Sequence, residues 1–282
     1  MKLLRYKYIY FAISLIILIP GVISLVKNGL RLSIDFTGGT LLEITSEKVD
    51  KSVLEKYGAF AQKSSDNTYV LRMHEIDNAQ KEKLLTEFGA TEKRFETVGP
   101  VVGKELTQKA FMAMAVASLM IIAYIAWSFR HVPKPYSSWK FGVSAVIALL
   151  HDALVVVGIF SIFGALWHVE IDSLFVTAVL TVIGFSVHDT IVVFDRVREN
   201  LPKMPKNTFE EVVDFSLSET LVRSLNTSLT AILTLVALLL FGGESIRWFV
   251  AALLVGIISG TYSSIFNAAP ILAIWESRPR AR

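Results

Sequence analysis

The sequence predicts an α-helical membrane protein with six transmembrane helices, grouped one plus five, and a small extracytoplasmic ferredoxin-like α+β domain between the first and second helices. Composition is the first observation: 53% of the 282 residues are hydrophobic and 19% are charged, whereas an average soluble chain is roughly 45–50% apolar and about 25% charged. The second is a set of six apolar runs, and the third is one long polar segment between the first two of them. The chain contains no cysteine, which excludes a disulfide scaffold, a zinc–cysteine site and a thiol nucleophile.

The first apolar run covers residues 8–26 and follows three basic residues, Lys2, Arg5 and Lys7. A stretch of about 20 apolar residues is long enough to cross the bilayer core as a helix. A secretory signal peptide is the alternative interpretation, but the run is too long for one and no A-x-A-like cleavage site follows it. We therefore expect residues 1–27 to form a retained transmembrane helix.

Five further apolar runs crowd the C-terminal two-thirds of the chain. They cover residues 110–129, 141–167, 173–194, 221–241 and 248–275. Because short connectors separate them, we expect residues 106–282 to form one five-helix transmembrane bundle with cytoplasmic loops and a C-terminal tail. Two of the runs contain ionisable pairs, His151-Asp152 and His188-Asp189, and Arg223 lies near the start of another.

Basic residues in the short loops predict the orientation, since cytoplasmic loops are enriched in Lys and Arg. One side collects Lys2, Arg5, Lys7, Arg130, Lys134, Lys140, Arg196, Arg198, Lys203, Lys206, Arg278, Arg280 and Arg282. The short loops of the other side carry Glu170, Asp172, Glu244 and Arg247. We therefore expect both termini in the cytoplasm and the long loop, residues 28–105, on the outside.

The long loop reads as a small folded domain of about 78 residues. Alternating apolar residues predict a strand over 30–36, a glycine-containing break, and a further extended segment at 41–45. Helical spacing follows at 49–57 and 76–88, with another alternating stretch at 69–73. The order strand, helix, strand, helix, strand indicates a ferredoxin-like module. Its acidic residues slightly outnumber its basic ones, so a nucleic-acid-binding face is not expected.

Besides the two histidines, three ionisable residues lie inside the apolar runs, namely Asp152, Asp189 and Arg223. A charge there is costly unless it faces a polar interior or a partner. Asp189 and Arg223 fall at similar depths on consecutive helices, so an ion pair between them is geometrically possible. This pair is either a static salt bridge that fixes helix register or a switch that responds to protons. Asp152 lies nearer the midplane. It either caps a polar cavity or forms a hydrogen bond to a neighbouring helix, or it joins that switch. For His151 and His188 we favour packing roles over proton relay.

Other motifs indicate packing rather than catalysis. Gly256 and Gly260 have the spacing of close helix contacts, and Thr208 with Glu211 forms a capping-box pattern that opens an amphipathic helix. The sequence lacks an HExxH zinc motif and a G-x-S-x-G nucleophile elbow. The G-x-G-D context of membrane aspartyl proteases is also missing around Asp189. We expect no catalytic residue, cofactor or metal site.

Several segments together identify a family. They are DFTGGT at 35–40, VGPVVG at 98–103, His151-Asp152, GFSVHDTIVVFDRVREN at 184–200 and RSLNTS at 223–228. Through them nearly the whole chain resembles the SecF family, the smaller membrane subunits of the SecDF accessory complex of the Sec protein-export machinery. These proteins belong to the resistance-nodulation-division superfamily.

The resemblance implies a proton-driven subunit of the bacterial plasma (inner) membrane that assists late preprotein translocation. Asp189 and Arg223 match the family's membrane acid and base, and Asp152 matches another acidic position, although His188 stands where many relatives carry Asn. The implied partners are a SecD-like subunit, the Sec translocon channel, unfolded preprotein and the lipid bilayer, with a homodimer as the fallback and no nucleic acid. Two alternatives stay open: a passive structural subunit of the translocase, and a half-transporter for a small molecule.

Overall fold

The computed structural model describes residues 2–47, 49, 51–65 and 67–277. The basic residues Arg278, Arg280 and Arg282, used above for orientation, lie outside this range. The chain forms two compact units. The membrane unit contains the chain up to Arg31, Ala113–Val169 and the chain from Leu174 onward, and the sheet unit contains Leu32–Met112 together with Glu170–Ser173.

Six helices of the described chain are long and apolar enough to cross a membrane, which confirms the predicted number of spans. The first joins the 3₁₀ turn η1 (Leu3–Tyr6) to α1 (Lys7–Asn28), and it is followed by α5 (Pro100–Ser128), α6 (Ser138–Trp167), α7 (Ser173–Asn200) and α8 (Phe209–Phe241). After the 3₁₀ turn η2 (Glu244–Ile246), the last span comprises α9 (Arg247–Ser263), the π-helical segment η3 (Ser264–Ala268) and α10 (Ala269–Ser277).

α8 merges two elements that the sequence pattern separates. The predicted amphipathic helix after Thr208 and the predicted span at 221–241 form one continuous helix of 33 residues. The predicted capping box is confirmed: the Thr208 hydroxyl accepts from the Glu211 amide at 3.3 Å, and the Glu211 carboxylate accepts from the Thr208 amide at 2.8 Å. The Arg196 guanidinium joins the end of α7 to α8 by two 2.8 Å bonds to Glu219.

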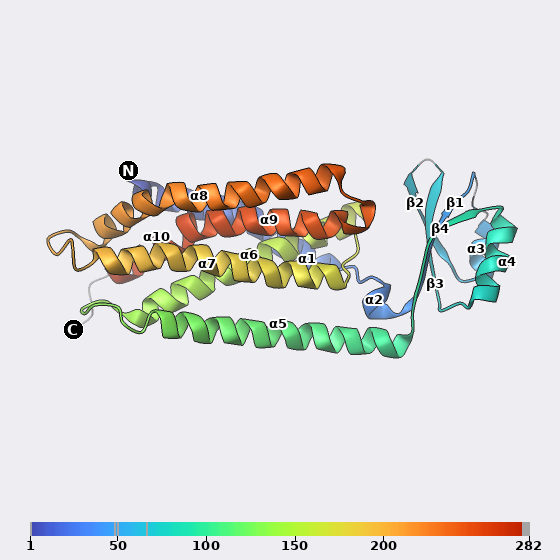
Figure 1. The fold of residues 1–282 in the computed structure, drawn as a ribbon, viewed down its shortest axis with the longest axis horizontal. Helices are drawn as coiled ribbons and strands as arrows, with labels where there is room; N and C mark the ends of the chain where they lie inside the picture. The colour runs from blue at the N-terminus through green and yellow to red at the C-terminus, as the bar shows by residue number, and fades with distance from the viewer. Residues whose placement is uncertain (1, 48, 50, 66, 278–282) are drawn as a thin grey trace. The chain divides into compact units, whose positions relative to one another are not determined.

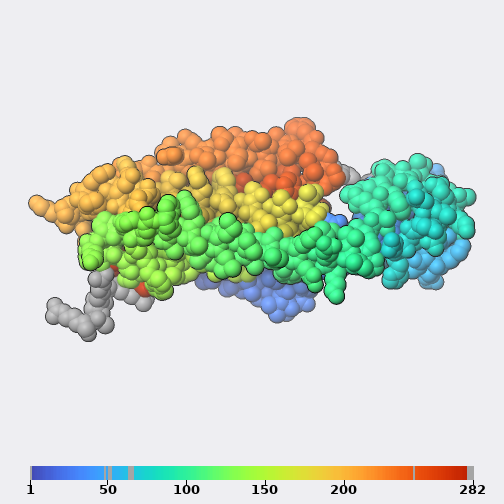
Figure 2. Space-filling model, turned by 60° about the horizontal axis from the view of Figure 1, so that its bottom comes forward, coloured from blue at the N-terminus to red at the C-terminus, as the bar shows by residue number. Residues whose placement is uncertain are grey.

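Small residues and aromatic rings hold the membrane unit together. α1 packs against α6 where Gly21 and Gly158 meet, so closely that a Cβ on Gly21 would lie 3.0 Å from the Gly158 Cα. Figure 1 shows α8, in orange, beside α9, in red, and the two helices are in contact. α5 has few buried residues and runs along the surface, as Figure 2 shows in green.

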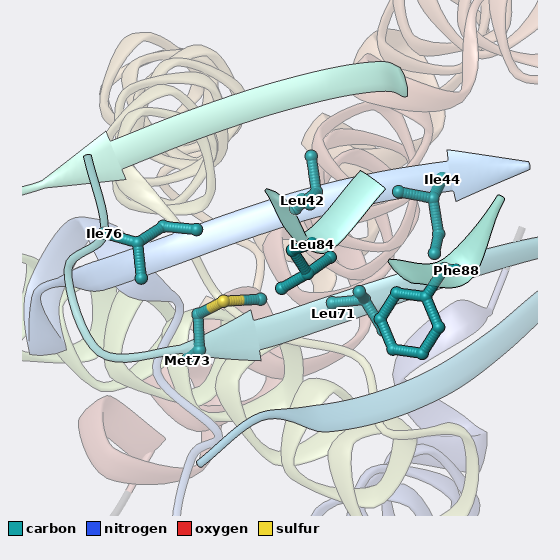
Figure 3. Close-up of a cluster of buried hydrophobic side chains, with 7 residues drawn as sticks. All are labelled: Leu42, Ile44, Leu71, Met73, Ile76, Leu84 and Phe88. Atoms are coloured by element: carbon teal, nitrogen blue, oxygen red, sulfur yellow. The ribbon is translucent and has the colours of Figure 1, made fainter. Parts of the chain in front are cut away.

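The sheet unit has the ferredoxin-like arrangement. Its elements are α2 (Ile34–Thr37), β1 (Gly39–Thr45), α3 (Lys51–Lys56), β2 (Phe60–Ser65), β3 (Thr68–Met73), α4 (Asn78–Phe88) and β4 (Thr91–Val98). The strands form an antiparallel sheet in the order β2-β3-β1-β4. Alternation along β1 and β3 sends Leu42, Ile44 and Leu71 to one face, where Leu84 and Phe88 of α4 cover them (Figure 3).

Two strand predictions in this unit need correction. The strand expected over residues 30–36 is wrong, because Ser33 caps the short helix α2 by accepting from the Asp35 amide at 3.2 Å. In that stretch Leu32 makes a single isolated bridge. The edge strand β2 was not predicted, since its sequence FAQKSS lacks the apolar alternation that marks a half-buried strand.

Candidate functional site

Asp152 on α6 lies in a cage of hydroxyl groups at the centre of the membrane unit. Its side chain is 1% exposed. Oδ2 accepts hydrogen bonds from Ser186 on α7 and Ser263 on α9, each at 2.5 Å, and Oδ1 accepts from Ser259 on α9 at 2.8 Å. The neighbouring His151 places Nδ1 3.0 Å from Oδ1. These donors satisfy the hydrogen-bonding capacity of the buried carboxyl group.

Asp189 on α7 is the second buried acid, with a side chain 3% exposed. Its Oδ2 accepts from the Ser228 hydroxyl on α8 at 3.4 Å, and that hydroxyl accepts in turn from Thr261 on α9 at 2.6 Å. His188 places Nδ1 3.6 Å from Oδ1, while its own side chain is 66% exposed. This histidine therefore connects a buried carboxylate to the surface of the membrane unit.

Hydroxyl contacts between α7 and Ser264, the first residue of η3, run beside both acids. Thr190 and Ser264 share a hydrogen bond of 2.8 Å, and the Ser264 hydroxyl also lies 3.3 Å from the Ser186 carbonyl oxygen. The predicted glycine contact explains the closeness: a Cβ on Gly260 would lie 3.0 Å from the Ser186 Cβ. Small residues at such spacing let helix backbones approach closely in a membrane.

The π-helical segment η3, which begins at Ser264, also contacts α1. Asn267, inside it, exchanges hydrogen bonds with the Ser14 hydroxyl of α1, with Nδ2 at 2.7 Å and Oδ1 at 3.0 Å. Pro270 follows and has no amide hydrogen to donate to the carbonyl of the preceding turn. π-helical turns of this kind are rare and frequently lie at functional sites.

The predicted Asp189–Arg223 ion pair is not formed. Among the described residues, the side-chain partners of Asp189 are Ser228 and His188, whereas Arg223 is exposed and makes no side-chain hydrogen bond or ion pair. The reason is rotational. Ser224 and Ser228 lie on the buried face of α8, and Arg223 lies on its exposed face.

An exposed polar face runs along α8 and another along α7. On α8 it consists of Arg223, Thr227, Thr230 and Thr234, and on α7 of Thr177, Thr181, Gly184 and His188. Both sets follow the spacing i, i+4, i+7, i+11, so each occupies one side of its helix. Small and polar side chains exposed on membrane spans are suited to another protein surface or to water rather than to lipid.

Sequence reasoning found both acids but missed most of the groups that bind them. The hydroxyls of Ser259 and Ser263 were not anticipated, although their i, i+4 spacing beside Gly256 and Gly260 was a usable signal. Histidine contacts were also underestimated, because adjacent side chains diverge on a helix and yet remain within reach of each other. The described residues contain no cluster of three metal-ligating His, Cys, Asp or Glu side chains. The arrangement places two buried carboxyl groups among hydroxyl groups of neighbouring helices and imidazole groups of adjacent residues.

Comparisons with known sequences identify relatives along the whole chain. The sequence model described as protein export membrane protein SecD/SecF, C-terminal, matches residues 80–278, and the SecD/SecF GG motif matches residues 23–48. The protein translocase subunit SecF of Thermobaculum terrenum is 48% identical over 98% of this chain and 94% of its own length. The SecF subunit of Escherichia coli O157:H7 is 35% identical over 95% of this chain and 85% of its own length.

Longer relatives contain a region that is similar to this chain over nearly its whole length. The protein translocase subunit SecDF of Bacillus subtilis is 37% identical, over 96% of this chain and 37% of its own length. The crystal structure of SecDF, a translocon-associated membrane protein from Thermus thermophilus, has a TM-score of 0.85 and 32% identity, over 98% of this chain and 38% of that one. The chain is therefore a bacterial membrane protein that belongs to the SecD/SecF family of protein export membrane proteins.

Proposed function

We propose that this protein is an accessory subunit of the Sec protein-export machinery that uses the proton-motive force to assist late preprotein translocation. It lies in the plasma membrane with both termini in the cytoplasm and the sheet unit outside. The basic loops described above support this orientation. Outside the cell, the sheet unit contacts unfolded preprotein after it has passed the translocon channel.

The chain works with a SecD-like partner. Its SecDF relatives are more than twice as long, and this chain corresponds to 37–38% of them. Transporters of this architecture are built from two related halves. The exposed polar faces of α7 and α8 support a partner as well, because the Arg223 and His188 side chains would otherwise face lipid.

Proton coupling involves Asp189, Arg223 and Asp152. The observation that carries the proposal is the burial of two carboxylates inside membrane spans: Asp152 lies in a cage of three serine hydroxyls, and Asp189 lies beside the Ser228 hydroxyl. A serine or threonine hydroxyl both donates and accepts, so such a cage accommodates a carboxylate and a carboxylic acid. His188 offers a route from the exposed face to Asp189.

Arg223 acts from the partner-facing side of α8. When Asp189 is ionised, a rotation of α8 brings the guanidinium toward it; when Asp189 is protonated, Arg223 returns to the exposed face. One charge crossing a potential of 100 mV supplies ~2.3 kcal/mol, which is sufficient to bias a balanced helix rearrangement.

The decisive experiment replaces the buried acid with its neutral isostere. Asp189→Asn should abolish the dependence of preprotein release on the proton-motive force, measured in membrane vesicles containing the chain and its SecD-like partner. Asp195→Asn is the matched control, because Asp195 lies on the same helix but is partly exposed and pairs with Arg198. Wild-type proton dependence in Asp189→Asn would refute the proposal.

The same experiment separates the two alternatives. A passive structural subunit predicts that Asp189→Asn reduces recovery of the complex and that export falls only in proportion to protein level. A half-transporter predicts proton-dependent efflux of a small molecule from vesicles that lack the translocon channel. Immunoblotting and copurification with the partner distinguish a loss of assembly from a loss of coupling.

A further inference from the structure

The connector between α6 and α7 belongs to the sheet unit rather than to the membrane unit. Its residues Glu170–Ser173 cluster with Leu32–Met112. Glu170 Oε1 lies 2.8 Å from Arg72 Nε on β3, with side chains 12% and 22% exposed. Ile171 forms a parallel bridge with Leu32, and its carbonyl oxygen accepts from the Ser33 amide at 2.9 Å. Three contacts at two consecutive residues, Glu170 and Ile171, therefore attach this short connector to the sheet unit.

Asp35 provides the next attachment, at the first residue of α7. Its Oδ2 accepts from the Ser173 amide at 3.0 Å and from the Ser173 hydroxyl at 2.7 Å. The first amides of a helix have no partner within the helix, so a carboxylate at this position satisfies a donor and complements the helix dipole. Asp35 is itself held by the Ser33 cap of α2.

The same segment also contacts the start of α5. A Cβ on Gly38 would lie 2.9 Å from the Pro100 Cα, and a Cβ on Gly103 would lie 2.9 Å from the Gly38 amide nitrogen. Thr107 donates from its hydroxyl to the Phe36 carbonyl oxygen at 3.3 Å. The glycines therefore permit a contact that larger residues would block, and one short segment is fastened to the beginnings of two spans.

We infer that the segment Leu32–Gly39, here called the clamp, mechanically couples α7 to the sheet unit, with Asp35 as its positioning residue. α7 is a continuous helix of 28 residues that carries Asp189. A helix transmits an axial displacement along its length. The connector Glu170–Ser173 is bonded to the sheet unit at Glu170, Ile171 and Ser173, so it follows a displacement of α7 instead of bending. A rearrangement of α7 around Asp189 is thereby passed to the sheet unit. This inference rests on the proposed function, because it names the link that proton coupling would use.

The absence of cysteine in the sequence makes the link measurable. Lys83→Cys on α4 and Ser245→Cys between α8 and α9 introduce two unique, exposed sites for spin labels. Pulsed electron paramagnetic resonance of the chain with its partner in lipid then reports the distance between the sheet and membrane units. Asp189→Asn mimics the protonated acid and should shift this distance distribution without any imposed gradient.

Removal of the hydrogen bonds between Asp35 and Ser173 should uncouple the change at Asp189 from the displacement of the sheet unit. In Asp35→Ala, the shift caused by Asp189→Asn should fall to less than one third, while Asp35→Asn, which keeps an acceptor oxygen, should retain more than half. Asp77→Ala is the matched control: Asp77 also caps a helix of the sheet unit, accepting from the Gln80 amide at 2.7 Å on α4, away from the connector. It should leave the shift unchanged.

Two outcomes would overturn the inference: a full shift in Asp35→Ala, or no shift in Asp189→Asn with the clamp intact. If the shift were lost because the sheet unit is destabilised, Asp77→Ala should lose it as well. Loss of the shift in Asp77→Ala would therefore also count against a specific role of Asp35. Failure of the proposed function looks different. In that case Asp189→Asn leaves the proton dependence of preprotein release unchanged. The change in label-to-label distance caused by Asp189→Asn, and its reduction in Asp35→Ala, would still be observed.

Discussion

Gly256 of α9 and Val182 of α7 lie so close together that a Cβ atom on the glycine would overlap the valine side chain. One turn later, Gly260 meets Ser186 in the same way. The two contacts bring the backbone of α9 within hydroxyl-bonding distance of α7, and Ser186, Ser259 and Ser263 can then share the Asp152 carboxylate. Close packing and the polar site are therefore one structural feature.

Gly256→Ala should destabilise the membrane unit by about 1–3 kcal/mol, the usual cost of adding atoms to a well-packed core. The measurement is thermal unfolding in detergent followed by tryptophan fluorescence, because all five tryptophans lie in the membrane unit. Gly184→Ala is the control, since a Cβ there would meet no atom within 4 Å. Equal melting temperatures for the two variants would contradict the packing argument.

Ser259→Ala should weaken the Asp152 cage by about 0.6–1.7 kcal/mol, the range measured for hydrogen bonds between membrane helices. A double-mutant cycle with Asp152→Ala isolates the interaction, because the effect of Ser259→Ala should vanish once its acceptor carboxylate is removed. Thr234→Ala serves as the comparison, since that exposed hydroxyl donates to the Thr230 carbonyl oxygen of its own helix. A coupling energy near zero between Ser259 and Asp152 would argue against the cage.

Gly39→Ala should disrupt the sheet unit more severely than Gly58→Ala, although both glycines have positive φ. Alanine at either position loses about 1–2 kcal/mol from backbone strain. At Gly39 the new Cβ would also lie 2.8 Å from the Met73 carbonyl oxygen, whereas at Gly58 nothing lies within 4 Å. Hydrogen exchange of the β1 amides should therefore accelerate strongly in Gly39→Ala and modestly in Gly58→Ala; the reverse order would exclude this explanation.

Thr208→Ala should loosen the first turn of α8 by about 1 kcal/mol, because the substitution removes the capping hydroxyl. Amide exchange at residues 210–212 should accelerate roughly fivefold, which corresponds to that free energy at 25 °C. Glu211→Gln keeps an acceptor for the Thr208 amide and should preserve slow exchange. If both variants exchanged alike, the carboxylate charge rather than the reciprocal hydrogen bonds would stabilise this helix end.

The sequence predicts the spans and the burial of both acids because apolar length and the cost of intramembrane charge are local properties. It does not predict the partner of Asp189. Depth along a helix follows from residue counting, but the direction of a side chain depends on how neighbouring helices are rotated. Arg223 and Ser228 differ by five residues and fall on different faces of α8, so the serine contacts Asp189.

In the sheet unit, too, a local sequence pattern fails where a contact from a distant part of the chain decides the structure. Alternation along residues 30–36 satisfies the rule for a strand, yet the Ser33 cap and the bonds of Asp35 to Ser173 direct the chain into a helical turn. That competing contact lies 138 residues away in sequence. Conversely, β2 pairs with β3 through its backbone and needs no apolar pattern of its own. Contacts of this kind become visible only when distant segments are brought together.

The wide turn at Ser264–Ala268 has a consequence for insertions and deletions. A π-helical turn contains one residue more than an α-helical turn, so the angular phase of α10 is offset by about 100° from that of α9. Deleting Ile265 would restore a uniform pitch and turn Asn267 away from Ser14. We expect such a deletion to detach the last span from the first, even though it changes the overall apolar length by a single residue.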